Sequence, residues 1–294
     1  MTLIDHIDSD NNIELPVFIC HYTSLENFIK ILDTKTFYLF NSYQMNDYKE
    51  NVRVIEILER VISQKKSLIP DDYLEKLKEI LSNEFYTSFI YICCFTELRD
   101  SLSQWRAYGD DGNGICLIFN PKDLGITYSL LSSNSEMRKF LSFHNVIYSE
   151  EQQEKLVEEI IKISLKSTNL FENGKAYTFA DKIIKYISMF APIFKINEFQ
   201  EEKEWRIIYG TKISYTNTST FYTSDYRNDI GFIQTRNNLK SFFPLKLDEV
   251  KFRQSLKSII LGPKTIIPDM EILTLLKTKG FHNTQVFRSK ISYR

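Results

Sequence analysis

The run FIYICCF at residues 89–95 constrains the fold more than any other feature of the sequence. A strand that covers only one side of a core alternates apolar with polar residues, but this run is apolar at both odd and even positions. Such a pattern is typical of a central strand with packed layers on both faces. The chain must therefore place this segment inside a sheet that is covered on two sides.

Other short, β-prone runs predict the remaining strands at 16–22, 36–40, 114–119, 205–209, 258–261 and 285–287. Amphipathic spacing predicts helices after residue 23, after the loop at 41–50 with Val52, Ile55 and Leu58 on one stripe, over about 71–85, through much of 150–196 and near 269–279. Helices and strands are mixed without regular β-α-β alternation, so we expect an α+β fold with a mixed or split sheet. Residues 1–14 are a polar tail, and 15–294 are expected to form one domain with a helical insertion at about 150–196.

Composition excludes several classes of protein. The 37 Lys and Arg residues nearly balance 38 Asp and Glu, so no global charge favours nucleic acid or an anionic membrane. No apolar run approaches the roughly 20 residues that span a bilayer, and the acidic start does not resemble a signal peptide. We therefore expect a cytoplasmic protein with no membrane partner. The four cysteines lie in apolar runs without C-x-x-C spacing, which indicates buried free thiols.

The C-terminal part of the chain is locally basic. From residue 251 onward, nine Lys or Arg residues stand against Asp269 and Glu271 alone. A solvated basic face and a contact to nucleic acid or phosphate both fit this pattern.

Familiar catalytic motifs are missing from the sequence. It has no phosphate-binding G-x-x-x-x-G-K-[ST], no G-x-G-x-x-G after a strand, no H-E-x-x-H and no G-x-S-x-G. The glycines of YGDDGNG, at 108–114, have the wrong spacing for a phosphate loop and predict a turn between a helix and a strand.

His21 is the first candidate site residue. It ends an apolar strand just before Thr23, which has capping-box spacing to Glu26, so its ring is expected close to a helix N-terminus that favours phosphate. Alternation places His21 and Thr23 on one face and Tyr22 on the other. A packed core histidine is the alternative.

The segment EEKEWRII, which begins at residue 201, is the second candidate. In an extended chain Glu202, Glu204 and Arg206 share one face, whereas Lys203 and Trp205 share the other. This arrangement suits a pair of catalytic carboxylates. The alternative is a solvated strand edge with a weak ion pair between Glu204 and Arg206.

The segment SLSQWRAYG, at 101–109, is the third candidate. On a helix, Ser101, Trp105 and Tyr108 lie near one face, close to Ser103, and could form an aromatic platform for a flat ring. Plain core packing of the aromatic residues fits equally well.

These motifs together resemble an uncharacterised bacterial family, known as a domain of unknown function and often encoded near phage-defence genes. The resemblance spans about 17–263 and is carried by H-Y-T-S-L from 21, N-D-x-x-E from 46, C-F-T-E from 94, W-x-x-Y-G from 105, G-I-C-L-I-F from 114, E-K-E-W-R from 202 and I-I-L-G-P from 259. More remotely, the family resembles ADP-ribosyltransferases, which bind NAD in a split sheet between a first-strand His or Arg, a Tyr or Ser-x-Ser element and a late Glu.

The resemblance implies a role for each matching residue. His21, with Tyr22 and Thr23, would hold the ribose and diphosphate of NAD, and Glu204 would stabilise the oxocarbenium-like transition state. Glu202 would orient an accepting nucleophile. The remaining binding residues implied are Ser103, Trp105, Tyr108 and Arg206. No metal is required.

Three functions remain open from the sequence. The first is an NAD-consuming transferase or glycohydrolase that serves as a toxic antiviral effector, with a protein or nucleic-acid acceptor and an antitoxin or defence-system partner. The second is a metal-dependent nuclease that uses Asp47, Glu50, Glu202 and Glu204, although helix capping suffices to explain Asn46, Asp47 and Glu50. The third is a non-catalytic sensor or partner-binding module of a defence system.

Overall fold

A computed structural model describes residues 14–42, 49–64, 69–82, 90–125, 141–167, 175–210, 230–235 and 238–293. Its strands are β1 (Ile19–Thr23), β2 (Thr36–Asn41), β3 (Ile90–Thr96), β4 (Ile115–Phe119), β5 (Leu141–Asn145), β6 (Glu204–Gly210), β7 (Gly231–Thr235), β8 (Asn238–Lys246), β9 (Leu256–Leu261) and β10 (Gln285–Arg288). In this part of the chain they form a single sheet of ten strands.

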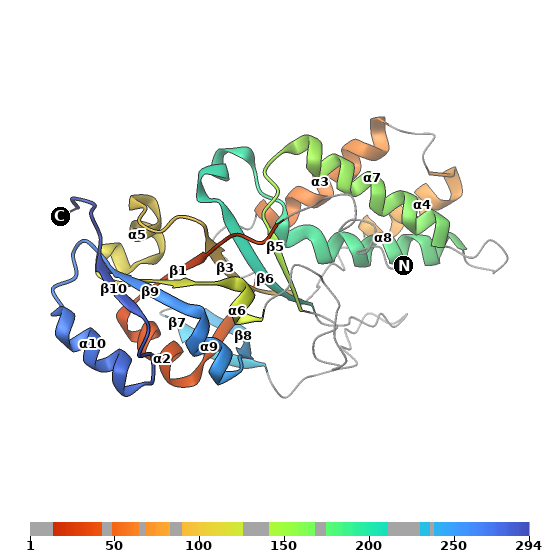
Figure 1. The fold of residues 1–294 in the computed structure, drawn as a ribbon. Helices are drawn as coiled ribbons and strands as arrows, with labels where there is room; N and C mark the ends of the chain where they lie inside the picture. The colour runs from red at the N-terminus through yellow and green to blue at the C-terminus, as the bar shows by residue number, and fades with distance from the viewer. Residues whose placement is uncertain are drawn as a thin grey trace.

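The helices cover both faces of this sheet (Figure 1). They are α2 (Leu25–Thr34), α3 (Lys49–Gln64), α4 (Asp71–Ser82), α5 (Leu102–Tyr108), α6 (Pro121–Leu124), α7 (Glu150–Ser167), α8 (Lys175–Phe190), α9 (Glu249–Ser255) and α10 (Asp269–Thr278). Three short 3₁₀ helices join them, η3 (Asp110–Gly112), η5 (Ala191–Ile193) and η6 (Asn197–Glu202). The helical character expected for the middle third is confirmed by α7 and α8.

The sheet is mixed, as the sequence predicts. Its main path runs β10-β9-β4-β1-β3-β2-β8-β7, with β9 and β10 parallel and the other neighbours on this path antiparallel. Strand β3 is the branch point, because it also pairs with β6 along its whole length, and β6 pairs with β5. Strand β1 pairs with β3 at Thr96, whereas β2 pairs with it at Tyr91 and Ile92. The sheet therefore divides between β1 and β2.

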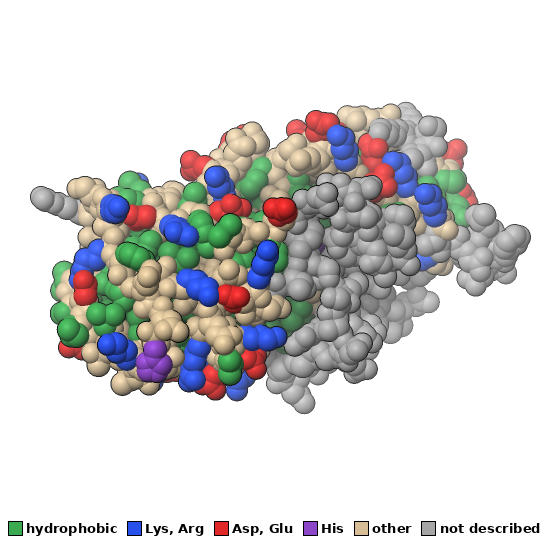
Figure 2. All heavy atoms as spheres, in the orientation of Figure 1, with side chains coloured by type: hydrophobic (Ala, Val, Ile, Leu, Met, Phe, Trp, Pro, Cys, Tyr) green, Lys and Arg blue, Asp and Glu red, His purple; other side chains and the backbone are tan. Residues whose placement is uncertain are grey.

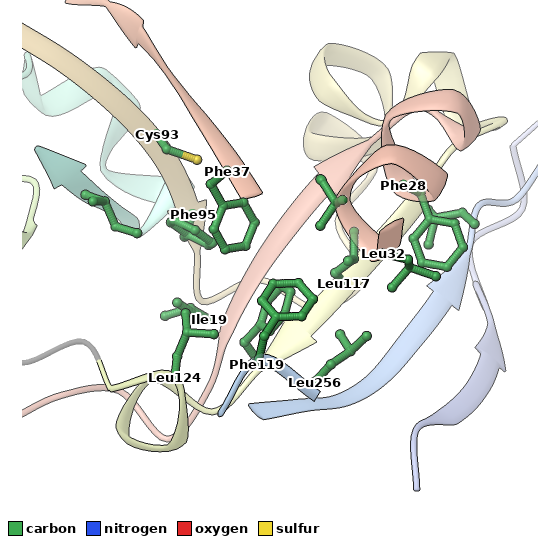
Figure 3. Packing of buried hydrophobic residues seen from close by; sticks show 14 of the residues in the cluster. Ile19, Phe28, Leu32, Phe37, Cys93, Phe95, Leu117, Phe119, Leu124 and Leu256 are labelled. Carbon is green, nitrogen blue, oxygen red and sulfur yellow. The ribbon is translucent and has the colours of Figure 1, made fainter. Parts of the chain in front are cut away.

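One face of the sheet, called face A here, carries a continuous apolar core. Helices α2, α6, α9 and α10 cover it, and Figure 3 shows Phe37 of β2 and Phe95 of β3 pointing toward one another there. Their ring centroids lie 5.2 Å apart in an edge-to-face arrangement, and Phe37 contacts Phe119 in the same way at 5.6 Å. These rings fill the space left where β1 and β2 diverge.

The opposite face, called face B, is covered in two separate parts. Over β3 and β6 it packs against α3, α4, α7 and α8, and over β1, β4 and β9 it packs against Trp105 of α5. Figure 1 shows the four helices grouped at one end of the molecule and α5 at the other. Because β3 is buried on both faces, the prediction from its apolar pattern is confirmed.

Strand β8 and the N-cap of α2 differ from what the local sequence predicts. Strand β8 contains Pro244, which argues against a strand inside a sheet. In the structure Pro244 lies opposite Tyr38 of β2, and among the described residues β7 pairs with β8 over 238–242 and does not reach Pro244. At α2 the capping residue is Ser24 and not Thr23, since Thr23 is still paired with Ile115 in the sheet.

The turn predicted from the glycines at 109–114 is confirmed between α5 and β4. Gly112 has a φ of +89°, and a Cβ atom at Gly114 would lie 2.2 Å from the carbonyl oxygen of Thr23. Only glycine allows the chain to pass so close to β1. The four cysteines are free thiols, three of them buried and Cys94 partly buried.

The basic C-terminal part of the chain is largely neutralised in the fold. Five of its cations form ion pairs with acids, namely Arg253 with Glu249, Lys257 with Asp123, Lys264 with Asp111, Lys279 with Asp33 and Arg288 with Asp269. Figure 2 shows Lys and Arg interspersed with Asp and Glu over this end of the molecule. Of the two alternatives for this segment, these ion pairs favour an ordinary solvated surface over a basic face that binds nucleic acid or phosphate. Within the described residues, no helix is long and apolar enough to cross a bilayer.

Candidate functional site

A row of polar side chains crosses face B where β3 meets β6. The two strands are antiparallel, with Cys94 opposite Arg206 and Thr96 opposite Glu204. These positions alternate with Phe95 and Trp205, which point into the apolar core of face A. The row lies between the part of face B covered by the four helices and the part covered by α5.

Glu204 and Arg206 form a buried bidentate ion pair. The Arg206 guanidinium donates from Nε to Oε1 at 2.8 Å and from Nη2 to Oε2 at 2.9 Å, and its Nη1 donates to the carbonyl of Pro192. Glu204 is only 7% exposed and Arg206 only 2%. Glu204 and Arg206 share one face of β6 as expected, whereas Glu202 precedes the strand in η6. The alternative of a weak solvated pair at a strand edge is wrong because Glu204 and Arg206 are both enclosed.

Lys195 extends this pair into a four-residue charge cluster, made of Lys195, Glu202, Glu204 and Arg206. Its Nζ lies 2.6 Å from Glu202 Oε2 and 3.2 Å from Glu204 Oε2, so one ammonium group joins the two carboxylates. Two carboxylates and two cations leave the cluster with no net charge. Such compensation is required when charges are removed from water.

Local backbone geometry positions Glu202 beside the sheet. Glu202 ends η6, and Lys203 follows it in a left-handed conformation with a φ of +45°, which turns the chain into β6. The Thr96 hydroxyl donates to the Glu202 carbonyl at 2.5 Å. The Glu202 side chain is 16% exposed and is therefore the more accessible of the two carboxylates.

The two glutamates differ in their acidity. Burial raises the pKa of Glu204, but the Arg206 guanidinium, the Lys195 ammonium and the Cys94 thiol outweigh burial and hold the pKa at about 2. Burial also raises the pKa of Glu202, and there the opposing effect of Lys195 does not cancel it. Glu204 is thus fixed as an anion, whereas Glu202 is the group better able to take up a proton.

Two phenols adjoin the charge cluster. The side chain of Tyr108 is half-exposed, and burial together with the Glu202 carboxylate raises its pKa to about 12. The Tyr148 hydroxyl accepts a hydrogen bond from the backbone N–H of Glu204 at 3.0 Å. Both phenols are protonated near neutral pH and can donate hydrogen bonds.

His21 does not join this site. Its ring lies on face A, where its centroid is 5.5 Å from that of Phe37 and 5.4 Å from that of Phe95, and its Nδ1 donates to the Cys94 carbonyl at 3.1 Å. The Cys94 thiol meets Glu204 on the other face of the same strand. Strand β3 therefore separates His21 from Glu204, and the prediction that both hold one ligand is corrected.

The neighbours of His21 are placed as alternation predicts. Thr23 shares face A with His21 and is buried, whereas Tyr22 lies on face B. The Tyr22 hydroxyl donates to the Leu98 carbonyl at 2.9 Å and accepts from the Ser101 N–H at 3.1 Å. These contacts hold the segment that leads into α5.

The residues of α5 divide into core and surface. Trp105 is fully buried, packs edge-to-face on Tyr22 at 4.7 Å and donates from Nε1 to Asp100 at 2.7 Å, so it cannot wall a ligand. The platform interpretation is corrected for Trp105 in favour of core packing. Ser103 is exposed, with its hydroxyl 2.9 Å from that of Ser101, on a helix and not on a strand.

Of the four residues expected for a nuclease, the structure describes the side chains of Glu202 and Glu204. Asn46 and Asp47 lie outside the described residues, as does the side chain of Glu50. Glu202 and Glu204 already face Lys195 and Arg206. Within the described part of the chain, no three His, Cys, Asp or Glu side chains are grouped so that they could hold a metal.

Lys195, Cys94 and Tyr148 are members of the site that the sequence did not indicate. Lys195 follows an apolar segment that includes Phe194, and nothing in its spacing distinguishes it from a surface lysine. Cys94 was assigned only as a buried thiol. Their roles depend on contacts across the fold, which a local pattern does not contain.

Comparison with known proteins gives one match. Residues 104–207 match a family model described as a protein of unknown function (DUF2971). The matched segment runs from α5 to β6, so it contains Tyr108 and the whole charge cluster but not His21. A search of the curated proteins and a search of the solved structures found no match.

Proposed function

We propose that the chain is an NAD-consuming enzyme, a transferase or a glycohydrolase, whose site is the charge cluster on face B. The observation that supports this most directly is the pairing of two carboxylates of unlike acidity, Glu202 and Glu204, beside the exposed phenol of Tyr108. The resemblance to ADP-ribosyltransferases supplies the substrate class, and of its three elements the late E-x-E of Glu202 and Glu204 lies in this cluster, with Tyr108 beside it and His21 apart from it. A split sheet of the ADP-ribosyltransferase type is part of the same proposal.

The chemistry requires stabilisation of a cation. When the bond between nicotinamide and ribose breaks, its electron pair leaves with nicotinamide and C1′ of the ribose becomes oxocarbenium-like. A water or acceptor hydroxyl then attacks C1′ and gives its proton to a base. Carboxylates that face the developing positive charge stabilise this transition state more than the ground state.

Within this proposal each residue has one task. Glu202, with its raised pKa, accepts the proton of the attacking nucleophile. Glu204 stays ionised and supplies negative charge, while Arg206 fixes its orientation. Lys195 releases the Glu202 carboxylate and binds a diphosphate oxygen of the ligand instead. Glu202 is then free to act as the base. Tyr108 donates a hydrogen bond at the accessible side of the cluster.

The test is release of nicotinamide from NAD by the purified protein, alone and with cell lysate or RNA as a source of acceptor. Wild type is expected to release nicotinamide, and Glu202→Gln is expected to reduce the rate at least 100-fold. Glu201→Gln is the matched control, because Glu201 lies in the same 3₁₀ helix but is exposed. Equal rates for Glu202→Gln and Glu201→Gln would remove Glu202 from the proposal.

The biological role that goes with this chemistry is a toxic effector of antiviral defence, held inactive by a partner or antitoxin. Expression of wild type should then stop bacterial growth and deplete cellular NAD, and Glu202→Gln should do neither. Growth arrest without loss of NAD would contradict the proposed reaction.

A second candidate function is a binding module without catalysis. The observation that favours it is the complete pairing of Glu204 by Arg206 and Lys195, with His21 on the other side of β3. Failure of wild type to release nicotinamide in every mixture would favour this candidate. Cleavage of an oligonucleotide that depends on added magnesium would instead favour the nuclease.

A further inference from the structure

A second polar and aromatic surface lies on face B, away from the charge cluster. Tyr38 and Phe40 of β2 stand beside Phe242 of β8, because Phe40 is the direct cross-strand partner of Phe242. Tyr38 stacks on Phe242 with ring centroids 4.1 Å apart and an angle of 21° between the planes. Phe40 adds a tilted ring at 6.1 Å. We call this group the aromatic patch.

The aromatic patch is open to solvent although it is made of large rings. Tyr38 is 40% exposed, and Phe40 and Phe242 are partly exposed, whereas Phe37 and Phe243 on face A of the same strands are buried. Large aromatic rings usually lie on the covered side of a sheet, where their apolar surface is buried. On the uncovered side they do not gain this burial. Their position therefore points to a partner.

The backbone makes room for the ring of Phe242. Its cross-strand partner in β7 is Gly231, where an added Cβ atom would lie 2.3 Å from Cζ of the ring. Any other residue at 231 would displace the ring from the strand surface. Glycine thus allows Phe242 to lie low across β7 beside Tyr38.

Positive charge surrounds the aromatic patch. Lys240 and Lys246 alternate with Phe242 along β8, so all three project from face B. Among the described positions that project from this face of β2, β7 and β8, none is acidic. A chain with a net charge of −1 has therefore placed two lysines and no acidic residue at the described positions of this face of the three strands, which also carry the aromatic patch.

We propose that the aromatic patch with Lys240 and Lys246 binds single-stranded nucleic acid. Aromatic rings on a sheet stack on unpaired bases of any sequence, and flanking lysines meet the phosphates. A double helix does not fit this chemistry, because its bases are already stacked and paired. The proposal is independent of the reaction at the charge cluster, since binding requires no NAD.

The test is fluorescence anisotropy with labelled 12-nucleotide U-rich RNA and T-rich DNA, without NAD or metal. Wild type is expected to bind with micromolar affinity that weakens as salt rises. Tyr38→Ala is expected to weaken binding about tenfold, consistent with loss of one stacked base. Phe232→Ala is the matched control, because Phe232 is 63% exposed in β7 on the opposite face and should leave the affinity unchanged.

A second variant keeps the test decisive if Tyr38→Ala fails to fold. The double substitution Lys240→Gln with Lys246→Gln removes only surface charge and should weaken binding. The slope of log affinity against log salt concentration should become shallower by an amount that corresponds to about two phosphate contacts. Absence of oligonucleotide binding by wild type at 100 µM protein, on the order of the weakest non-specific affinities, would overturn the proposal. So would equal affinities for Tyr38→Ala and Phe232→Ala, or competition of the oligonucleotide by an unrelated peptide.

Discussion

Near its end at Thr96, strand β3 meets a different environment on each of its two faces. On face A, Phe95 packs against the rings of His21, Phe37 and Phe143 within an apolar core. On face B, Cys94 adjoins a bidentate ion pair and a lysine that joins two glutamates. Only the thickness of one strand separates the two environments.

We use this difference to separate the residues that stabilise the fold from those that we propose for chemistry. Apolar burial is non-directional and tolerates approximate fit, so face A can be stable without any special geometry. A buried charge cluster adds little net stability compared with apolar residues of the same shape, yet it fails when one partner is missing. The charge cluster on face B therefore carries a desolvation cost that apolar residues in its place would avoid. This is why we propose that the functional site lies there.

The largest change in the free energy of unfolding is expected when only one partner of the buried ion pair, Arg206, is removed. Arg206→Met leaves Glu204 buried with only Lys195 as a partner, so the free energy of unfolding should fall by about 3 to 5 kcal/mol. Urea unfolding followed by circular dichroism measures this loss. The double variant Glu204→Leu with Arg206→Met should recover most of it, because no unpaired charge remains. If the double variant is less stable than Arg206→Met, the cluster stabilises the fold directly and our contrast between the faces is wrong.

A smaller effect is expected on face A. Ile19 is fully buried there, and Ile19→Val removes one methylene from an apolar environment that can partly relax. The expected loss is about 0.5 to 1.5 kcal/mol, again measured by urea unfolding. A loss as large as that of Arg206→Met would show that face A is as intolerant of change as face B.

Acid should protonate His21 and Glu204, which lie on opposite faces, in different pH ranges. Burial lowers the pKa of His21 below its ordinary value of 6.5, so the unfolded chain binds that proton first and stability falls as the pH drops below about 6.5. Glu204 has a pKa of about 2 against an ordinary value of 4.5, so its contribution is lost as the pH falls from about 4.5 toward 2.

The measurement is the free energy of unfolding from pH 8 to pH 3 for three proteins. His21→Asn, which keeps a donor for the Cys94 carbonyl, should reduce the slope in the upper range but not abolish it. The slope that remains comes from His144, because burial lowers the pKa of its side chain to about 4. The double variant Glu204→Leu with Arg206→Met should flatten only the lower range. A change in the other range by either variant would contradict the assignment of these groups.

The smallest effect on stability is expected at the accessible side of the cluster. Tyr108 is half-exposed, so Tyr108→Phe should change the free energy of unfolding by less than about 0.5 kcal/mol. If Tyr108 binds ligand, the same variant should raise KM for NAD at least fivefold in a nicotinamide-release assay. An unchanged KM would leave Tyr108 as an ordinary surface residue.

Local patterns predicted the frame of this fold well. The apolar runs indicated β1, β2, β3, β4, β6, β9 and β10, and the helical periodicity indicated α2, α3, α4, α7, α8 and α10. Strand β8 was missed because Pro244 argues against a strand, although it is compatible with pairing to Tyr38 of β2. That compatibility is a property of the assembled sheet and is not visible in the segment itself.

The site was predicted less completely, for the same reason. Alternation along β6 correctly placed Glu204 and Arg206 on one face, but their burial depends on the segment after α8. Lys195 enters the site through that segment, and no spacing in the sequence indicates it. His21 was assigned to the site from its position before a helix, and the packing of Phe37 and Phe95 overrides that expectation.

The most direct test of the account compares kcat/KM for nicotinamide release between His21→Asn and Glu202→Gln. The two residues lie on opposite faces of the sheet, and only Glu202 belongs to the charge cluster. We predict that His21→Asn keeps kcat/KM within about threefold of wild type, whereas Glu202→Gln lowers it at least 100-fold. The reverse result, with His21 required and Glu202 dispensable, would contradict the assignment of function to face B.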